Sequence, residues 1–223
     1  MMVEKRVNIA FNGFGRIGRN LVRKLVTDKR YNIVAINARS TISVRAHLFK
    51  YDSIYGHFDG DISFELDNLI IDGHTIPNFD RRTPSKLPWE ELEVDYVIDS
   101  SGKFTNKHDL EQHIEAGAKN VIVTSPAKDV DATLVYGVNE NEYKVQETNI
   151  ISASSCTTTC LTPLLKVLQK TYGIKQGYVT TIHSYTMGQS LLDNANPDLR
   201  RSRAAALSMI PTTTGAAQNV GLI

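Results

Sequence analysis

Two residues of this sequence, Cys156 and His183, form a candidate nucleophile and base. Cys156 follows an apolar, strand-like run at residues 149–152 and opens a helix-like stretch that ends near Tyr172. Backbone N–H groups at the start of a helix have no partners within the helix and carry partial positive charge, so they stabilise a thiolate. His183 ends a second strand-like run, Tyr178–His183, directly after that helix. In a strand–helix–strand crossover the two strand ends lie side by side, which predicts contact between the imidazole and the thiol.

Each of these residues also has an ordinary structural interpretation. Free cysteine is among the most buried residue types, and a histidine at a strand end is often only hydrogen-bonded. The surroundings favour chemistry, because five hydroxyl residues flank Cys156 in the run Ser154–Cys160 and a nucleotide-binding motif stands upstream. Cys160, one turn further along the expected helix, is expected to pack inward rather than react.

That upstream motif is a glycine-rich turn near the start of the chain. Gly13-x-Gly15-x-x-Gly18 follows an apolar strand at residues 7–12 and opens a helix, and a second strand at residues 32–37 completes a βαβ unit. Gly13 permits the tight turn, Gly15 lets the backbone approach a diphosphate, and Gly18 lets helix and strand pack closely. The diphosphate would lie at the helix N-terminus. The alternative is a glycine-rich turn that holds no ligand.

The residues after the second strand bear on which dinucleotide would bind. An acid at this position would hold the adenosine ribose 2′-OH and repel a 2′-phosphate. The sequence instead has Ala38, followed by Arg39 and Ser40, which offer a cation and a hydroxyl to a phosphate. NADP is therefore favoured over NAD, although Arg39 could equally be a solvated loop charge.

The remaining pattern completes an α/β fold. Residues 62–79 alternate around Asp72-Gly73 and predict a hairpin inserted into the sheet. Strands expected at residues 94–98, 120–124 and 133–138 flank a helix expected at residues 107–118. We therefore expect a Rossmann-type doubly wound, mostly parallel sheet over residues 1–153 and the start of a second, α+β catalytic domain over residues 154–223.

The composition excludes several classes of protein. The 223 residues carry 25 Lys and Arg against 24 Asp and Glu, a net charge of +1, so no bulk field favours nucleic acid or an anionic membrane. Two cysteines one helical turn apart argue against a structural disulfide, and no Cys/His set has zinc spacing, so no metal is expected. The sequence shows no signal-peptide pattern and no apolar run long enough to cross a bilayer, which favours a cytoplasmic location.

Taken together, the motifs resemble the phosphorylating glyceraldehyde-3-phosphate dehydrogenase family. The resemblance rests on segments that run in order along the chain: Asn12–Arg19, Lys50–Ser53, Ser101–Phe104, Ser155–Thr158, Thr180–His183, Asp198–Arg201 and Ile210–Ala217. It implies NAD(P)-dependent, phosphorylating oxidation of glyceraldehyde 3-phosphate to 1,3-bisphosphoglycerate, in glycolysis or gluconeogenesis, with a sugar-phosphate aldehyde and inorganic phosphate as partners. It also implies a homotetramer.

The resemblance further implies roles for individual residues. Cys156 is similar to the family nucleophile and His183 to its base. The cofactor-binding residues would include Arg16, Ile17, Arg82, Ser101, Gly102 and Thr124. Ser155, Thr157, Thr214 and Gly215 would bind the attacking phosphate, and Thr186 and Arg203 would hold the phosphates of substrate and nucleophile.

Several positions depart from the family pattern. Gly188 replaces an acid or hydroxyl on the substrate-phosphate side, and Asn194-Ala195 stands where NAD-preferring members have Leu-Pro, which together with Ala38 resembles the NADP-accepting branch. Family members continue beyond the position of Ile223, so we expect the chain to be the leading fragment of a longer polypeptide. Two alternatives stay open: an erythrose-4-phosphate dehydrogenase, and a nucleotide-binding or assembly module without turnover.

Overall fold

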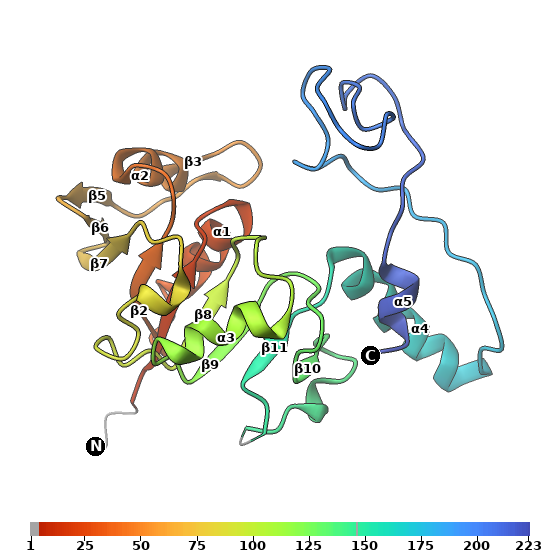
Figure 1. Ribbon diagram of the computed structural model, residues 1–223, viewed down its shortest axis with the longest axis horizontal. Coiled ribbons are helices and arrows are strands. Elements are labelled where there is room, and N and C mark those ends of the chain that lie inside the picture. The colour runs from red at the N-terminus through yellow and green to blue at the C-terminus, as the bar shows by residue number, and fades with distance from the viewer. Residues whose placement is uncertain (1–4, 146) are drawn as a thin grey trace. The chain divides into compact units, whose positions relative to one another are not determined.

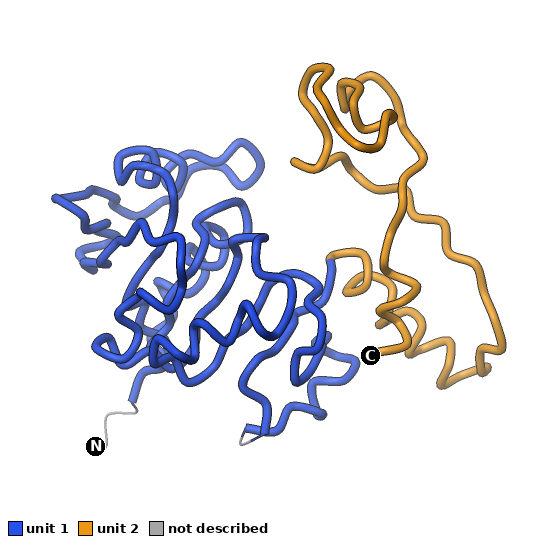
Figure 2. Tube along the Cα trace, in the orientation of Figure 1, with its two compact units in different colours: residues 1–155, 223 blue, residues 156–222 orange. Residues whose placement is uncertain are grey.

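The structure is a computed structural model that describes residues 5–145 and 147–223. It divides into unit 1, which runs to Ser155 and includes Ile223, and unit 2, Cys156–Leu222 (Figure 2). This division lies two residues after the domain boundary expected between residues 153 and 154. Each unit is described separately below.

Unit 1 is built on a nine-stranded sheet with the order β10-β11-β9-β8-β1-β2-β7-β6-β5 (Figure 1). Neighbouring strands from β10 to β7 run parallel, whereas β5 and β6 pair antiparallel at one edge. The strands are β1 (Val7–Asn12), β2 (Tyr31–Asn37), β5 (Ile62–Glu65), β6 (Asn68–Ile71), β7 (His74–Phe79), β8 (Tyr96–Asp99), β9 (Asn120–Val123), β10 (Ala132–Thr133) and β11 (Ile150–Ser152). The expected mostly parallel, doubly wound sheet is confirmed.

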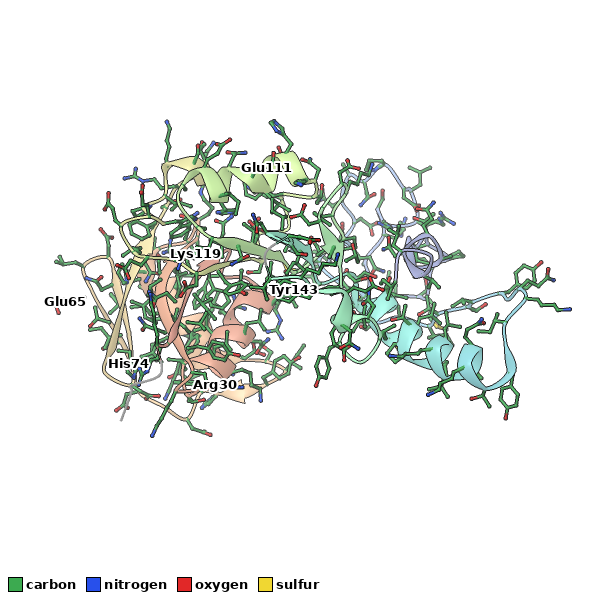
Figure 3. All side chains as sticks on the ribbon, turned by 90° about the horizontal axis from the view of Figure 1, so that it is seen from below. Arg30, Glu65, His74, Glu111, Lys119 and Tyr143 are labelled. Atoms are coloured by element: carbon green, nitrogen blue, oxygen red, sulfur yellow. The ribbon has the colours of Figure 1, made fainter. Side chains whose placement is uncertain are left out.

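Helices cover both faces of this sheet. Successive residues of a strand point to opposite faces, so an apolar strand such as β1 presents apolar side chains on both, and each face is buried by helices. In β1, Ile9 and Phe11 join a core with side chains of the first two helices. Ala10 joins a second core, with Leu110 of the third helix and with Trp89 from the loop before β8. Glu111 of the third helix and Arg30, just before β2, lie on opposite sides of unit 1 (Figure 3). The helices are α1 (Arg16–Leu25), α2 (Ile42–Lys50) and α3 (Lys107–Glu115).

Shorter elements complete unit 1. Strands β3 (Tyr51–Asp52) and β4 (Gly56–His57) form a small separate hairpin, and single 3-10 turns occupy Pro84–Lys86 and Glu140–Glu142. The large sheet reverses its strand order at β1, because β2 lies on one side of it and β8 on the other. In open α/β sheets, ligands bind at such a switch point, beyond the carboxyl ends of the strands.

Unit 2 contains two helices, α4 (Cys156–Tyr172) and α5 (Ala216–Val220), which pack against one another. Residues 173–215, all of which the structure describes, form no helix or strand. The buried residues of unit 2 are Thr158 and Thr162 on α4 and Ala216 on α5. This unit therefore has a very small interior of its own.

Local sequence signals set several of the boundaries in unit 1. Asp72 and Gly73 both have positive φ, 47° and 78°, as a type I′ turn requires, and they join β6 to β7 in the expected hairpin. Helix α3 begins after Asn106, whose side chain accepts a hydrogen bond from the Asp109 N–H at 2.9 Å. It ends before Gly117, which has a φ of 99°.

Three expectations about local structure are wrong. The run Tyr178–His183 is coil, with Tyr178 98% exposed, because no strand of the described residues pairs with it. The strand expected at residues 133–138 ends at Thr133, where the Asn139 side chain bonds the Val135 N–H and the Thr133 carbonyl and forms a turn instead. Cys160 is exposed, because the small buried face of α4 is formed by threonines.

Candidate active site

The thiol of Cys156 and the imidazole of His183 are in direct contact within unit 2. The distance between Cys156 Sγ and His183 Nε2 is 3.4 Å. Cys156 is the first residue of α4, and the backbone N–H of Thr157 at that helix start bonds its sulfur. The side chain of Thr157 lies nearby, with its hydroxyl 4.0 Å from the sulfur. The contact expected between nucleophile and base is therefore present, although the strand that was to deliver His183 is not.

The other ring nitrogen of His183 is also engaged. Nδ1 lies 2.7 Å from the Ser184 carbonyl, which can only accept, so Nδ1 carries a proton. Nε2 of the neutral ring is then free to accept the proton of the Cys156 thiol. After that transfer, the imidazolium donates from both nitrogens, to the carbonyl and to the thiolate. The geometry thus suits a thiolate–imidazolium pair.

The ionisation of both groups follows from this geometry. The pKa of the Cys156 thiol is lowered, chiefly by its hydrogen bond to His183 and also by bonds from the Thr157 hydroxyl and backbone N–H. The pKa of His183 is raised, first by the Ser184 carbonyl and then by the sulfur. Each shift favours the charged form of its group, so the ion pair becomes more populated near neutral pH.

The chain reaches Cys156 through an unusual residue. Ser154 is buried and has a φ of 63°, a left-handed conformation that a residue with a Cβ rarely adopts. Its N–H donates to the Ser152 hydroxyl at 3.0 Å, which closes a tight turn directly after β11. This turn ends the strand and redirects the backbone into α4. Ser155, the last residue before the helix, is half-buried.

The residues expected to bind phosphates lie in unit 2 apart from Ser155, the last residue of unit 1 before α4, and several of them make other contacts. Arg203 pairs with Asp193 at 3.4 Å, and the Thr186 hydroxyl accepts from the Gly188 N–H at 3.3 Å. The Thr214 hydroxyl accepts from the Ala216 N–H, and Gly215 directly precedes α5, so this turn opens a helix. The contacts named here for Arg203, Thr186 and Thr214 involve neither Cys156 nor His183, whereas the Thr157 hydroxyl contacts the Cys156 sulfur.

In unit 1, the three glycines of the nucleotide motif have different surroundings. A Cβ on Gly13 would lie 2.5 Å from the Ser101 nitrogen, and one on Gly18 would lie 2.4 Å from the Gly13 carbonyl oxygen. Both glycines are therefore required by packing within the protein. A Cβ on Gly15 would meet no atom within 4 Å, and its φ of −79° suits any residue. Neither packing nor backbone conformation therefore requires glycine at this position. The space beside Gly15 is open at the N-terminus of α1, where a diphosphate would bind.

The other expected cofactor residues lie at the carboxyl ends of neighbouring parallel strands. Ser101 and Gly102 follow β8, Thr124 follows β9, and Ala38 follows β2. Ile17, in the first turn of α1, is 54% exposed. The structure thus brings these residues, from separate parts of the sequence, to the same edge of the sheet as the glycine turn. Arg82 is exposed and follows β7.

Arg16 directs its side chain away from the glycine turn. Its guanidinium forms an ion pair with Asp52 and lies 5.7 Å from the centre of the Tyr55 ring. The pKa of Asp52 is lowered by the backbone N–H groups of Tyr55 and Ile54 and further by Arg16, which keeps this carboxylate charged. The guanidinium is thus occupied, and the role expected of Arg16 concerns its backbone N–H at the helix start.

A buried polar network lies beneath the glycine turn, and the motifs alone did not reveal it. The Asn12 amide donates to Asp99 at 2.6 Å, and the same carboxylate accepts from the Ser101 N–H and hydroxyl. His113 Nε2 lies 3.3 Å from Asp99, and the indole N–H of Trp89 donates to His113 Nδ1 at 3.0 Å. Since an indole only donates, His113 Nδ1 is an acceptor, and its Nε2 donates to Asp99. The network fixes the strand ends that carry the turn.

Other kinds of site are absent from the described residues. No group of three His, Cys, Asp or Glu side chains is arranged to hold a metal ion within residues 5–145 and 147–223. Over the same ranges, no helix is both long enough and apolar enough to cross a bilayer. What remains is a nucleotide turn in unit 1 and a thiol–imidazole pair in unit 2.

Sequence comparison identifies the family to which both features belong. The pattern described as "Glyceraldehyde 3-phosphate dehydrogenase, NAD binding domain" matches residues 7–107, and the one described as "Glyceraldehyde 3-phosphate dehydrogenase, C-terminal domain" matches residues 155–223. The chain belongs to the glyceraldehyde 3-phosphate dehydrogenase family. Its glycine turn lies within the first match and its Cys156–His183 pair within the second.

Individual members of this family are similar over nearly the whole chain. Glyceraldehyde-3-phosphate dehydrogenase 2 of Bacillus subtilis is 47% identical over 218 residues, covering 98% of this chain and 64% of the relative. The Geobacillus stearothermophilus enzyme is 47% identical over 217 residues, and the Thermotoga maritima enzyme 49% over 218 residues. These alignments cover 97% and 96% of this chain and 65% of each relative. The chain therefore spans just under two thirds of the length of these relatives.

Proposed function

We propose that this chain carries the cysteine, the base and the cofactor-binding turn of a phosphorylating, NAD(P)-dependent glyceraldehyde-3-phosphate dehydrogenase. The observation that carries the proposal is the 3.4 Å contact between Cys156 Sγ and His183 Nε2 at the start of α4. A thiolate at a helix start, paired with an imidazole, is a nucleophile suited to a carbonyl carbon. Membership of the family supports glyceraldehyde 3-phosphate as the aldehyde.

The first half of the reaction uses Cys156 and His183 together. The thiolate adds to the aldehyde carbon and the imidazolium gives its Nε2 proton to the carbonyl oxygen, which forms a hemithioacetal. As the carbon is oxidised, that hydroxyl proton returns to the now neutral His183 Nε2. A bound nicotinamide ring supplies the acceptor for the hydride that leaves the same carbon. The carbon is thereby oxidised to a thioester on Cys156. The Ser184 carbonyl holds the opposite ring nitrogen and keeps Nε2 directed at the reacting atoms.

The second half releases the product and restores the thiolate. Inorganic phosphate attacks the thioester carbon, the C–S bond breaks, and 1,3-bisphosphoglycerate leaves. Hydroxyl and N–H donors suit the binding of that phosphate because they bond its oxygens without carrying charge. We assign this role to Ser155, Thr157, Thr214 and Gly215. We further propose that Thr186 and Arg203 hold the phosphate group of the substrate and the attacking inorganic phosphate.

The residues of unit 1 fit a dinucleotide. The space beside Gly15 would receive the diphosphate, with Arg16 and Ile17 supplying backbone N–H groups. Ser101, Gly102, Thr124 and Arg82 would border the rest of the ligand. This fit applies to NAD and NADP alike.

We further propose that NADP is favoured over NAD. Ala38 places no carboxylate at the ribose, and Arg39 and Ser40 follow it. Arg39 forms a surface ion pair with Asp80 at 2.9 Å, with 45% and 58% of the two side chains exposed. An exposed pair of this kind is weak, so a bound 2′-phosphate would compete for Arg39.

A single-turnover experiment tests the reaction. The chain is mixed with glyceraldehyde 3-phosphate and NADP, with and without inorganic phosphate, and NADPH is followed by absorbance. We expect NADPH to form and phosphate to raise its yield, while Cys156→Ser forms none. Formation of NADPH by Cys156→Ser would refute the nucleophile. Cofactor binding without any NADPH would favour a nucleotide-binding module. The same experiment is repeated with erythrose 4-phosphate, and faster turnover of that aldehyde would favour an erythrose-4-phosphate dehydrogenase.

The remaining expectations concern the setting of the protein. We propose a homotetramer, as the family resemblance implies, and a cytoplasmic location, as the cysteine pattern favours, with no nucleic-acid or membrane partner. The nearly balanced charge of +1 supports the absence of nucleic acid. Light scattering of the purified protein tests the tetramer.

A further inference from the structure

Arg45 is a buried cation next to the residue that would face the cofactor ribose, and no expectation from the sequence included it. It lies in the first half of α2 and is only 4% exposed. Arginine is effectively always protonated in proteins, so this position holds a positive charge inside unit 1. Charged side chains are almost never fully buried unless an opposite charge pairs with them.

The partners of Arg45 are neutral. One guanidinium nitrogen donates to the Ala38 carbonyl at 2.6 Å, and another donates to the Asn78 side-chain oxygen at 2.9 Å. Nε is buried without a hydrogen-bond partner. The carboxylates that act on this guanidinium are those of Asp80 and Asp67, and among the described residues neither forms an ion pair with it. The charge of Arg45 is therefore hydrogen-bonded to neutral groups and offset only at a distance, by Asp80 and Asp67.

The position of this charge relates it to the cofactor. Ala38, whose carbonyl Arg45 binds, occupies the place where an acid would meet the adenosine ribose. Asn78 belongs to β7, which pairs with β2 and ends beside Ala38. Arg45 thus lies directly behind the end of β2. A charge in a buried, low-dielectric position is poorly screened, so its field extends to an anion bound at that strand end.

Holding the Asn78 side chain and the Ala38 carbonyl in place does not by itself require an arginine at position 45. The Asn78 side-chain N–H donates to the Ile76 carbonyl at 2.8 Å, which fixes its oxygen toward Arg45. A neutral donor would satisfy that oxygen and the Ala38 carbonyl without the cost of burying a charge. A bound 2′-phosphate would offset that cost, because it places negative charge close to the buried cation.

We propose that Arg45 is a specificity-determining residue that favours a 2′-phosphate on the adenosine ribose of the bound dinucleotide. This inference rests on the NADP preference proposed above and names a second, buried source for it besides Arg39. Asp80 opposes the preference, because its carboxylate lies near the same strand end and forms an ion pair with Arg39. The net effect is a buried positive charge behind Ala38 and a weak, neutral ion pair at the surface.

The test measures binding of two probes that differ only in the 2′-phosphate, adenosine 2′,5′-bisphosphate and 5′-AMP. Dissociation constants are measured calorimetrically on the full 223-residue chain. We expect the unmodified chain to bind the bisphosphate more tightly. Arg45→Gln should reduce the ratio of the two affinities about tenfold, mainly through the bisphosphate, and Arg45→Lys should retain most of it.

A second variant neutralises the charge without removing the arginine. Asn78→Asp is isosteric and places a carboxylate against Arg45, so it should reduce the affinity ratio even if Arg45→Gln does not fold. Arg30→Gln is the matched control, since it removes the same charge at the opposite end of β2, about 20 Å away, where Arg30 pairs with Asp28. Its affinity ratio should equal that of the unmodified chain.

The outcomes separate this inference from the proposed cofactor preference. If the unmodified chain binds both probes equally, the NADP preference and the role of Arg45 both fail. If the chain prefers the bisphosphate but Arg45→Gln and Asn78→Asp keep that preference within about twofold, only the role of Arg45 fails. Equal weakening of both probes would also overturn it, because Arg45 would then only hold the loop in place.

Discussion

His183 acts on Cys156 through one ring nitrogen while the Ser184 carbonyl holds the other. Because the thiol hydrogen bond to His183 is the largest cause of the lowered Cys156 pKa, the reactivity of the thiol depends mainly on this contact, with a further contribution from Thr157. The thiolate is the reactive form of cysteine, so alkylation rate measures its population directly.

Replacing His183 by asparagine should shift the reactivity of Cys156 to higher pH. The pKa of the thiol is lowered in the native pair, so the thiolate is present at pH values where an ordinary thiol is protonated. His183→Asn removes the largest cause, which raises the pKa and lowers the thiolate population near neutral pH. The measurement is the rate of iodoacetamide alkylation from pH 5 to 10, with Cys156 followed by peptide mass spectrometry.

Cys160 provides an internal reference for this measurement. It is exposed on the same helix, so its alkylation reports any general change in access. His183→Asn should leave the Cys160 profile unchanged. Identical Cys156 profiles in the native chain and in His183→Asn would contradict the role of the imidazole.

The dinucleotide preference that we propose rests in part on another position, Ala38. Ala38→Asp should weaken NADP binding by about tenfold or more, because the new carboxylate repels the 2′-phosphate and accepts the ribose 2′-OH of NAD. Dissociation constants for the two cofactors are the measurement. Ala38→Asn, which has the same shape without the charge, is the control. An unaltered ratio in Ala38→Asp would remove the argument from this position.

Residue types and spacing sufficed to predict the Cys156–His183 pair but not the path of the chain between them. The expected strand at Tyr178–His183 is coil, yet the two side chains meet. Arg45 and Asp80 were not predicted, because their relation to Ala38 depends on how α2 and β7 pack beside β2. Asp99 ends an apolar strand, so the sequence could have indicated it as a buried polar residue. Its partner His113 could not be predicted, because the contact depends on how α3 packs on the sheet.

At the scale of elements, the glycine turn has two kinds of position, one that packing requires and one that we assign to binding. Gly13 and Gly18 lie against the protein backbone, and Gly15 faces open space. The same substitution at Gly15 and at Gly18 should therefore have opposite consequences. This contrast separates the structural role of the motif from its role in binding.

Gly18→Ala should destabilise unit 1 by about 1–3 kcal/mol, because its Cβ would overlap the Gly13 carbonyl. Gly15→Ala should change stability by less than about 1 kcal/mol, since lost capping and reduced backbone entropy offset one another. It should nevertheless weaken dinucleotide binding, because the methyl group occupies the open space. Urea unfolding followed by the fluorescence of the single Trp89, together with NAD titration, measures both effects. A Gly15→Ala chain that binds NAD normally would contradict this site.

Elements with a strong local signal were predicted well from the sequence. The βαβ unit, the Asp72-Gly73 turn and the helix after Asn106 each depend on nearby residues, and the structure contains all three. Strand β10 was overestimated, because the Asn139 side chain ends it with a turn that hydrophobic alternation does not reveal. Strand β5 within the expected hairpin segment pairs with β6 across Leu66, which has positive φ despite not being glycine.

At the scale of the whole molecule, the two units differ in how much they bury. Unit 1 contains two apolar cores, including the fully buried Trp89, Phe11 and Phe49. Unit 2 buries Thr158, Thr162 and Ala216 and exposes apolar side chains along α4, such as Leu164 and Val167. Since burial of apolar surface provides most of the stabilisation of folded proteins, the two units should resist local unfolding very differently.

Limited trypsin digestion should therefore cut residues 173–215 well before unit 1. Lys175 and Arg200 lie in exposed coil, where a protease can bind the chain without prior unfolding. The expected first product ends at Lys175 or Arg200 and keeps the fluorescence of Trp89, which lies in unit 1. Mass spectrometry of a time course identifies the cuts, and Lys175→Gln should shift the earliest cut to the arginines. First cuts within the sheet of unit 1 would contradict this difference, because a protease reaches those strands only after the apolar cores open.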